Sequence, residues 1–317
     1  MANQAPKIGV ITGPTATGKT ALGVIIAKEL NGEIVSADSM QVYRRMDIGT
    51  AKVSPEEMQG IPHHMIDVAE PFENYSVARY VKEADVCIQD ILSRGKLPII
   101  VGGTGLYIDS LVAGRNFDEN ASDDELRLRL EEKYEVLGGE KMQKELFDID
   151  PERANKLHPS DKKRILRALE VYYTTGRTIT EHDEETKKIP LKYRAATIAL
   201  SFENRSDLYE RIDKRVDMMA QAGLFDEVQS ILKSGVSDKC TAMQAIGYKE
   251  AAMAIRGEIS KNEALELIKQ ESRRYAKRQL TWLRRKENIR WILWSASPDF
   301  EYGRQISTEF CSSYGLE

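Results

Sequence analysis

The chain has 317 residues, of which 41% are apolar and 30% are charged, and its formal net charge is −4. This composition is typical of a soluble globular protein, and the length favours two domains or one core with an insertion. No run of about 18 apolar residues occurs, so no transmembrane helix is predicted. The three cysteines, Cys87, Cys240 and Cys311, lie far apart and include no C-x-x-C pair, so neither a disulfide framework nor a zinc module is suggested. We therefore expect a cytoplasmic protein with reduced thiols and no membrane partner.

The first predicted element is a strand that starts at Lys7 and leads into a glycine-rich loop and a helix. The spacing Gly13-x4-Gly18-Lys19-Thr20 fits the Walker A pattern, in which loop N–H groups and a helix N-terminus bind linked phosphates. Lys19 would contact the terminal phosphate oxygens, and the Thr20 hydroxyl would complete the shell of a Mg2+ ion. The spacing leaves open which phosphate compound binds and whether ATP is involved. The predicted phosphate-binding residues are Gly13, Pro14, Thr15, Ala16, Thr17, Gly18, Lys19 and Thr20.

Two more predicted strands end in polar residues. The strand over residues 33–37 is followed by Asp38-Ser39-Met40-Gln41, and the buried strand over residues 97–101 by Gly102-Gly103-Thr104. Ligands of open α/β sheets bind outside the carboxyl ends of the strands, so Asp38 and Thr104 could line the same crevice as Thr20. Spacing alone leaves open whether Asp38 acts in catalysis, caps a helix or supports a Mg2+ ion indirectly.

Between these strands the pattern is broken into short polar pieces. Ser54 is predicted to be the N-cap residue of a helix, with Glu57 as the glutamate of its capping box. A longer helix is expected over residues 76–93. Adjacent histidines point in different directions on a helix or a strand, so we expect no metal site at His63 and His64.

Residues 116–188 are densely charged and helical in pattern, without a convincing strand. They predict an α-helical insertion between two β-containing parts, residues 1–115 and 189–317. Within it, a helix capped by Ser160 or Asp161 should end near Gly176. Its predicted buried stripe is Ile165, Leu166, Leu169, Tyr172 and Tyr173. This leaves Lys163, Arg164 and Arg167 at the surface. They could bind a partner there, or they could form only structural salt bridges to the acidic helices nearby.

After the insertion the strand pattern returns at residues 195–201, followed by an amphipathic helix over residues 207–221. Its predicted buried residues are Leu208, Ile212, Val216 and Met219. Arg211 and Arg215 lie four residues apart on another face, where they could approach phosphates or pair with Asp207 and Glu210.

Near the C-terminus, residues 273–290 carry eight Lys and Arg residues against one Glu. Apolar residues recur among them at helical spacing and would turn one face to the core. A solvated basic face is one interpretation, and a surface that holds a phosphate backbone is the other.

Several stretches together resemble the tRNA dimethylallyltransferases. They occur in the family's order and cover nearly the whole chain, and the set is specific although Walker A alone is not. The matching stretches are residues 13–20, 36–43, 102–107, 158–170, 245–250 and 276–284. Thr17 stands where Ser is at least as common in the family, and no C-terminal zinc finger is present, which fits the shorter bacterial form. The resemblance implies an α/β fold with a P-loop NTPase-like parallel sheet flanked by helices, and a helical insertion domain.

The resemblance also implies transfer of a dimethylallyl group from dimethylallyl diphosphate to N6 of the adenosine 3′-adjacent to the anticodon in tRNA. Asp38 would be the general base, and Thr104 and Arg215 would be the other catalytic residues. The departing diphosphate would be met by loop amides, Lys19, Arg215 and Mg2+ near Thr20. A monomer is expected.

The implied tRNA contacts fall into two groups. Asp38, Ser39, Met40, Gln41 and Thr104 would contact the flipped base and its neighbours. The anticodon stem-loop would be held by Arg127, Lys163, Arg164, Ile165, Leu166, Arg167, Lys277 and Arg278.

Two other functions use the same loop. A small-molecule or nucleoside monophosphate kinase would bind ATP there, with Asp38 as the base for an acceptor hydroxyl. A P-loop regulatory or RNA-binding module without catalysis would leave the convergence of Asp38 and Thr104 unexplained.

Overall fold

The computed structural model describes residues 5–115 and 124–316, except for the side chains of Asp124 and Lys187. The chain divides into two compact units, residues 1–112 with 192–317, and residues 113–191. The first eight residues of the predicted insertion, 116–123, lie outside the described residues.

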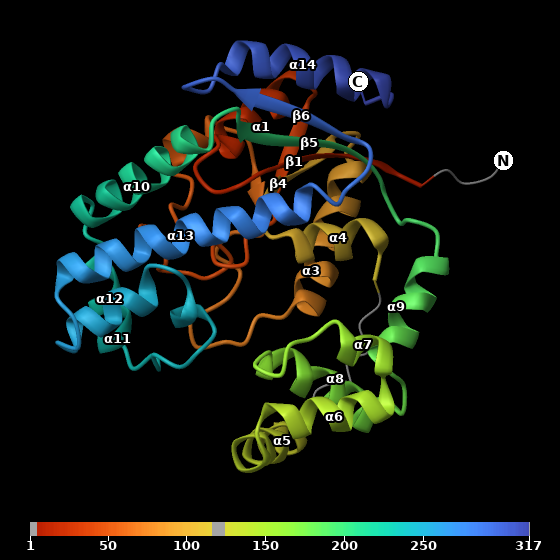
Figure 1. Ribbon diagram of the computed structural model, residues 1–317. Coiled ribbons are helices and arrows are strands. Elements are labelled where there is room, and N and C mark those ends of the chain that lie inside the picture. Colours follow the sequence, from red (N-terminus) through yellow and green to blue (C-terminus); the bar gives the residue numbers. More distant parts are fainter. Residues whose placement is uncertain (1–4, 116–123, 317) are drawn as a thin grey trace. The chain divides into compact units, whose positions relative to one another are not determined.

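The larger unit is built on a six-stranded parallel sheet with the strand order β3-β2-β4-β1-β5-β6. Figure 1 labels β4, β1, β5 and β6 of this sheet. Its strands are β1 (Lys7–Thr12), β2 (Gly32–Ser36), β3 (His63–His64), β4 (Leu97–Gly102), β5 (Arg194–Phe202) and β6 (Ile289–Trp294). Thr12 lies opposite Gly102 of β4 and Ala199 of β5, so the loops that follow β1 and β4 leave the sheet at the same edge. The chain moves from β1 to one side of the sheet and later returns to its other side, which places the phosphate loop at the topological switch point.

Helices cover both faces of this sheet because successive strand residues point to opposite sides. On one face, Ile8, Val10 and Ile100 pack with residues of α3 (Val77–Ser93), α4 (Gly105–Ala113), α11 (Leu224–Lys233) and α12 (Tyr248–Ile255). On the other, Ile11 and Ile99 pack with residues of α1 (Lys19–Glu29), α10 (Arg205–Gln221) and α14 (Phe300–Ser313). The long helix α13 (Lys261–Leu283) packs along α10 and α12 (Figure 1). The short helices are α2 (Pro55–Met58) and η1 (Ala242–Gln244).

The elements of this unit confirm most of the sequence predictions, including the parallel α/β fold class. Ser54 caps α2 in a capping box with Glu57. The prediction for the basic stretch was wrong in one respect: the helix ends at Leu283, and Arg290 is the single charged residue of β6, whose other five residues are apolar. His63 and His64 form the edge strand β3.

The smaller unit contains only helices among its described residues. They are α5 (Asp124–Leu137), α6 (Gly139–Ile149), α7 (Pro151–Asn155), α8 (Lys162–Thr175) and α9 (Ile179–Lys188). Their core includes Leu130, Met142 and Ile165. Asp161 is the N-cap residue of α8, and Gly176 ends the helix with a φ of 71°. Tyr173 was wrongly predicted as buried, since it is 47% exposed and its hydroxyl donates to Glu145.

None of the helices in the described ranges is both long and apolar enough to cross a bilayer.

Candidate active site

The phosphate loop joins β1 to α1 and depends on two glycines. Gly18 adopts a φ of 85° as the N-cap residue of α1, and Gly13 a φ of 150°. A Cβ at Gly13 would lie 2.5 Å from the Leu200 carbonyl oxygen, so a larger residue would displace the loop. From β6, the Trp294 indole N–H donates to the Thr17 carbonyl at 2.9 Å. The loop is therefore held by β5 and β6 as well as by its own glycines.

Asp38 and Thr104 lie together at the ends of β2 and β4. The Thr104 hydroxyl accepts a hydrogen bond from the Ser39 N–H at 3.0 Å, and the Thr104 N–H donates to the Ala37 carbonyl at 3.0 Å. Asp38 Oδ1 accepts from the N–H groups of Met40 at 2.9 Å and Gln41 at 3.3 Å. Asp38 therefore caps its own turn with one oxygen, which fixes the direction in which the carboxylate points.

Electrostatics connect Asp38 to the phosphate loop. Lys19 is half-buried, with its ammonium group enclosed, and this burial lowers its pKa to about 7; the positive charge of Arg215 lowers it further, and the negative charge of Asp38 opposes both. Burial also lowers the pKa of Arg215, again opposed by Asp38. The Arg215 Nε is buried and has no hydrogen-bond partner among the described residues. Two cations and one carboxylate therefore converge at the carboxyl edge of the sheet.

Arg211 has a different role from the one that spacing suggested. Its Nε donates to the Ala16 carbonyl at 3.2 Å, and its guanidinium lies 5.5 Å from the centre of the Phe202 ring. Arg211 therefore braces the phosphate loop, whereas Arg215, one turn later on α10, contributes its unpaired nitrogen to the charged cluster.

Sequence reasoning missed two residues of α13 that belong to this site. Burial and then the negative charge of Asp38 raise the pKa of Tyr275 to about 12, so its neutral phenol lies near the carboxylate. Gln279, one turn later, is buried and accepts a hydrogen bond from the Thr15 N–H at 3.1 Å. Their four-residue spacing on one face of a basic helix was the available signal. Tyr275 was assigned to the core-facing side of that helix, and Gln279 entered only within the stretch 276–284 that resembles the family.

Comparison with known proteins identifies the family. Residues 41–286 match the family model described as IPP transferase, and residues 6–71 match the one described as Isopentenyl transferase. The chain belongs to the IPP transferase family. A tRNA dimethylallyltransferase of Caldanaerobacter subterraneus subsp. tengcongensis is 49% identical over 306 residues, which cover 96% of this chain and 97% of the relative. One from Bacillus licheniformis is 48% identical and covers 95% of each chain.

Solved structures agree with this membership of the IPP transferase family. The tRNA isopentenylpyrophosphate transferase of Bacillus halodurans is 40% identical, with a TM-score of 0.72 and coverage of 96% of each chain. A eukaryotic dimethylallyltransferase acting on tRNA is 31% identical, with a TM-score of 0.82 over 98% of this chain and 80% of its own. These relatives are transferases, and they support prenyl transfer over the kinase alternative.

In this IPP transferase, the predicted tRNA-contacting residues of the larger unit lie near Asp38 or on the surface of α13. Ser39, Met40 and Gln41 follow Asp38 and are half-buried. The Gln41 side-chain amide donates to the carbonyls of Thr50 and Ala51, each at 3.3 Å. Lys277 and Arg278 are exposed, and the Arg278 guanidinium lies 5.6 Å from the centre of the Tyr275 ring.

The predicted tRNA-contacting residues of the smaller unit divide into two sets. Lys163, Arg164 and Arg167 are exposed on α8, while Arg127 of α5 pairs with Glu131 at 3.6 Å. The other set is Ile165 and Leu166, which are 0% and 6% exposed in the helical core. Their side chains pack in that core and are shielded from solvent, and their predicted contact with RNA stays a prediction.

The oxygen ligands at the phosphate loop fit a Mg2+ ion that is held mainly by phosphate oxygens. The described residues include no group of three or more His, Cys, Asp and Glu side chains that could hold a metal ion. Thr20 is exposed in the first turn of α1, where its hydroxyl is available as a single oxygen ligand. Mg2+ commonly takes one or two protein oxygens and completes its shell with water and phosphate oxygens. His63 and His64 are engaged elsewhere, by the Ile61 carbonyl and by Glu33.

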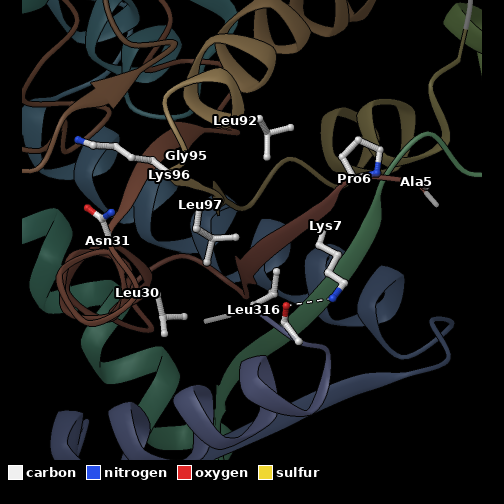
Figure 2. A pocket seen from close by; sticks show the side chains of 11 residues that line it. Ala5, Pro6, Lys7, Leu30, Asn31, Leu92, Gly95, Lys96, Leu97 and Leu316 are labelled. Carbon is white, nitrogen blue, oxygen red and sulfur yellow. Dashed lines mark hydrogen bonds between the residues drawn. The ribbon is translucent and has the colours of Figure 1, made fainter. Parts of the chain in front are cut away.

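A surface pocket lies at the opposite edge of the sheet. Figure 2 shows it between Lys7 and Leu97, the first residues of β1 and β4, with Leu316 near the C-terminus. The Lys7 ammonium there donates to the Gly315 carbonyl at 3.0 Å. Because ligands of parallel sheets bind at the carboxyl ends of the strands, this pocket is separate from the candidate active site.

Proposed function

We propose that the chain transfers a dimethylallyl group from dimethylallyl diphosphate to N6 of the adenosine 3′-adjacent to the anticodon of a tRNA, and releases diphosphate. The observation that carries the proposal is the convergence of Asp38 with Lys19 and Arg215. The carboxylate can accept a proton from the attacking group, and the two cations can stabilise an anionic leaving group. The names of the relatives support the tRNA acceptor and the prenyl donor.

The acceptor amine needs a base. The N6 lone pair of adenine is delocalised into the ring, so the amine becomes a useful nucleophile only as it loses a proton. In the proposed reaction N6 attacks C1 of the dimethylallyl group, the C1–O bond breaks, and its electron pair goes to the diphosphate oxygen. The N6 proton passes to the Asp38 carboxylate, whose Oδ1 is already oriented by the Met40 and Gln41 N–H groups. General-base catalysis of this kind contributes roughly 10²–10⁴-fold.

The leaving group requires fixed positive charge. Negative charge grows on the diphosphate as the C1–O bond breaks, and preorganised donors in an enclosed site stabilise it at little reorganisation cost. Lys19, Arg215 and the first N–H groups of α1 would supply these donors. The unpaired Arg215 Nε supports this role, because a buried guanidinium N–H without a partner is costly unless a ligand completes it.

Thr20 would hold Mg2+ against the same diphosphate. The ion would add positive charge at the phosphate oxygens. No other protein ligand is assigned to it.

The acceptor side of the site would receive a base extruded from its stack. Thr104 and Gln41 lie beside Asp38, where they could contact the edges of a flipped adenine. Lys277 and Arg278 extend the same face with exposed cations that suit RNA phosphates. Because its substrate would be tRNA, we place the enzyme in the cytoplasm.

The decisive experiment incubates the purified protein and an unmodified tRNA transcript with labelled dimethylallyl diphosphate or with γ-labelled ATP. We expect label in the tRNA only from the prenyl donor. Asp38→Asn should reduce turnover by roughly 10²–10⁴-fold while tRNA affinity changes little, since an amide oxygen can still accept from Met40 and Gln41. Transfer of phosphate from ATP, or near-normal turnover by Asp38→Asn, would contradict the proposal.

A further inference from the structure

Two carbonyl groups of the phosphate loop are bound by side chains that lie much later in the chain. The Ala16 carbonyl accepts from the Arg211 Nε of α10 at 3.2 Å, and the Thr17 carbonyl accepts from the Trp294 indole N–H of β6 at 2.9 Å. A trans peptide group points its N–H in the direction opposite to its carbonyl, and the described residues contain no cis peptide bond. The Trp294 bond therefore turns the Gly18 N–H away from the indole, and the Arg211 bond turns the Thr17 N–H away from the guanidinium.

The Trp294 ring has little room to move. It is 1% exposed, and a Cβ at Gly303 of α14 would lie 2.7 Å from it. The Phe300 ring meets it edge to face, with 6.0 Å between the ring centres. Phe300 also lies against Gly18, where a Cβ would be 3.0 Å from its ring. β6 and the start of α14 therefore cover the side of the loop to which the Thr17 carbonyl points.

The backbone of the loop is strained where these two bonds hold it. Ala16 adopts a φ of 66° and Gly18 a φ of 85°. A positive φ is unfavourable for a residue with a Cβ, and it persists only where the surrounding structure fixes it. The Arg211 bond is such a restraint, and the guanidinium is itself held 5.5 Å from the centre of the Phe202 ring. Backbone N–H groups that converge in a turn of this kind form a concavity that binds anions.

The Gly18 N–H is a donor without an acceptor at the start of α1. Among the residues that the structure describes, no backbone carbonyl outside the regular helices and strands binds it, and Gly18 precedes α1. The next N–H groups, those of Lys19 and Thr20, lie in the first turn of α1 and have no partner within the helix. All three are at the positive end of the helix dipole, where an anion is stabilised. The Trp294 bond selects the peptide orientation in which the Gly18 N–H can join the other two.

We propose that Trp294 and Arg211 are positioning residues for the leaving group: they fix two peptide groups of the loop so that the Gly18 and Thr17 N–H groups face the diphosphate. The inference rests on the proposed function, which places a diphosphate at the loop. A flipped peptide would set a carbonyl oxygen against the anion, which removes a donor and adds a repulsion. Donors that are fixed before the reaction stabilise the growing charge without reorganisation.

The test measures binding of one inorganic probe, pyrophosphate, to the full chain by titration calorimetry with Mg2+ and without tRNA. Trp294→Phe removes the indole N–H and keeps an aromatic ring in the core. We expect it to raise the Kd for pyrophosphate by roughly 10- to 100-fold, the range of one hydrogen bond to a charged group. Trp291→Phe makes the same change at a half-buried position of the same strand and should leave the Kd unaltered.

Arg211→Lys tests the second bond at constant charge. Lysine keeps the positive charge but not the fixed N–H of the guanidinium, so a loss of affinity reports the orientation of the peptide and not long-range attraction. We expect the Kd for pyrophosphate to rise by roughly 3- to 10-fold. Arg205→Lys, at an exposed position of the same helix, is the control and should bind as the unaltered protein does.

Melting temperatures separate positioning from packing. A lower melting temperature of Trp294→Phe with an unaltered Kd would make Trp294 a structural brace only and overturn the proposal. An unaltered protein that binds no pyrophosphate would overturn it as well. If Trp294→Phe does not fold, Arg211→Lys decides, because Arg211 is only half-buried, and an unaltered Kd there counts against the proposal. Since no prenyl transfer is measured, a failure of the proposed function would be seen separately, in the tRNA assay.

Discussion

The Glu227 carboxylate of α11 accepts a hydrogen bond from the Ile48 backbone N–H at 2.7 Å, across 179 residues of sequence. The same carboxylate accepts from the N–H groups of Asp47 at 2.8 Å and Gly49 at 3.1 Å, and the Tyr248 hydroxyl donates to it as well. The segment that it holds continues to Thr50 and Ala51, whose carbonyls bind the Gln41 side chain. Glu227 thus positions a residue beside Asp38 without touching it.

Glu227→Gln should destabilise this segment. An amide oxygen can still accept, but its NH2 group meets a backbone N–H that needs an acceptor, so we expect a loss of about 1–3 kcal/mol in the free energy of unfolding. The tRNA KM should rise more than kcat falls, because Gln41 lies on the acceptor side of the site. Chemical denaturation and steady-state kinetics measure the two effects. Glu309→Gln, at an exposed position of α14, is the control, and equal behaviour of the two variants would contradict the role of Glu227.

Arg215→Ala should impair the prenyl donor side. Removing the guanidinium takes away charge that grows in importance as diphosphate leaves, so turnover should fall by about 10²–10³-fold and the KM for dimethylallyl diphosphate should rise. The tRNA KM should change little. Lys214→Ala, at the exposed neighbouring position of α10, is the matched control. Unchanged donor KM and turnover in Arg215→Ala would leave this arginine a purely structural role.

The lowered pKa of Lys19 predicts how stability depends on pH. The folded protein releases the Lys19 proton near pH 7, whereas an unfolded chain keeps it to about 10.4. Between these values the unfolded state binds more protons, so the Lys19 contribution makes the free energy of unfolding rise with pH. Below pH 7 both states are protonated and this pH dependence disappears. Over pH 6 to 9, denaturation should show the free energy of unfolding of the unaltered protein rising relative to that of Lys19→Met.

Pyrophosphate binding should restore the proton on Lys19. The anion favours the charged ammonium, so binding at pH 8 should take up about one proton more in the unaltered protein than in Lys19→Arg, whose guanidinium stays charged. Calorimetry in buffers of different ionisation enthalpy measures this number directly. Equal proton uptake in both proteins would show that Lys19 is already charged in the free site.

Lys277 and Arg278 should contribute to tRNA affinity by binding phosphates. Each cation that binds a phosphate releases condensed counterions, so the slope of log K against log salt should become less steep by roughly 0.7–0.9 for each such cation removed. The double change Lys277→Ala and Arg278→Ala should therefore flatten the slope by roughly 1.4–1.8. Lys28→Ala with Lys233→Ala removes two exposed cations from other helices as a control. An unchanged slope would remove α13 from the RNA interface.

The sequence determined the phosphate loop and the succession of the central strands along the chain. Walker A spacing fixes a strand, a loop and a helix locally, and strand periodicity is likewise a short-range signal. Asp38 and Thr104 were predicted to lie in one crevice because strands of a parallel sheet end at a common edge, and the Ser39–Thr104 hydrogen bond confirms their proximity. In α8, the same short-range reasoning identified a buried stripe, and Ile165 and Leu166 lie within it.

Only the tertiary structure decided how the rest of the chain completes the site. The bond between Gln279 and Thr15 spans 264 residues, that between Arg211 and Ala16 spans 195, and Trp294 reaches Thr17 across 277. No local periodicity encodes such pairings, because each depends on where a helix or strand comes to rest against a loop formed far earlier in the chain. The sequence by itself named a phosphate site and a nearby carboxylate. Folding decided which of its many arginines, glutamates and glutamines meet them, since burial and hydrogen bonding act through space and not along the chain.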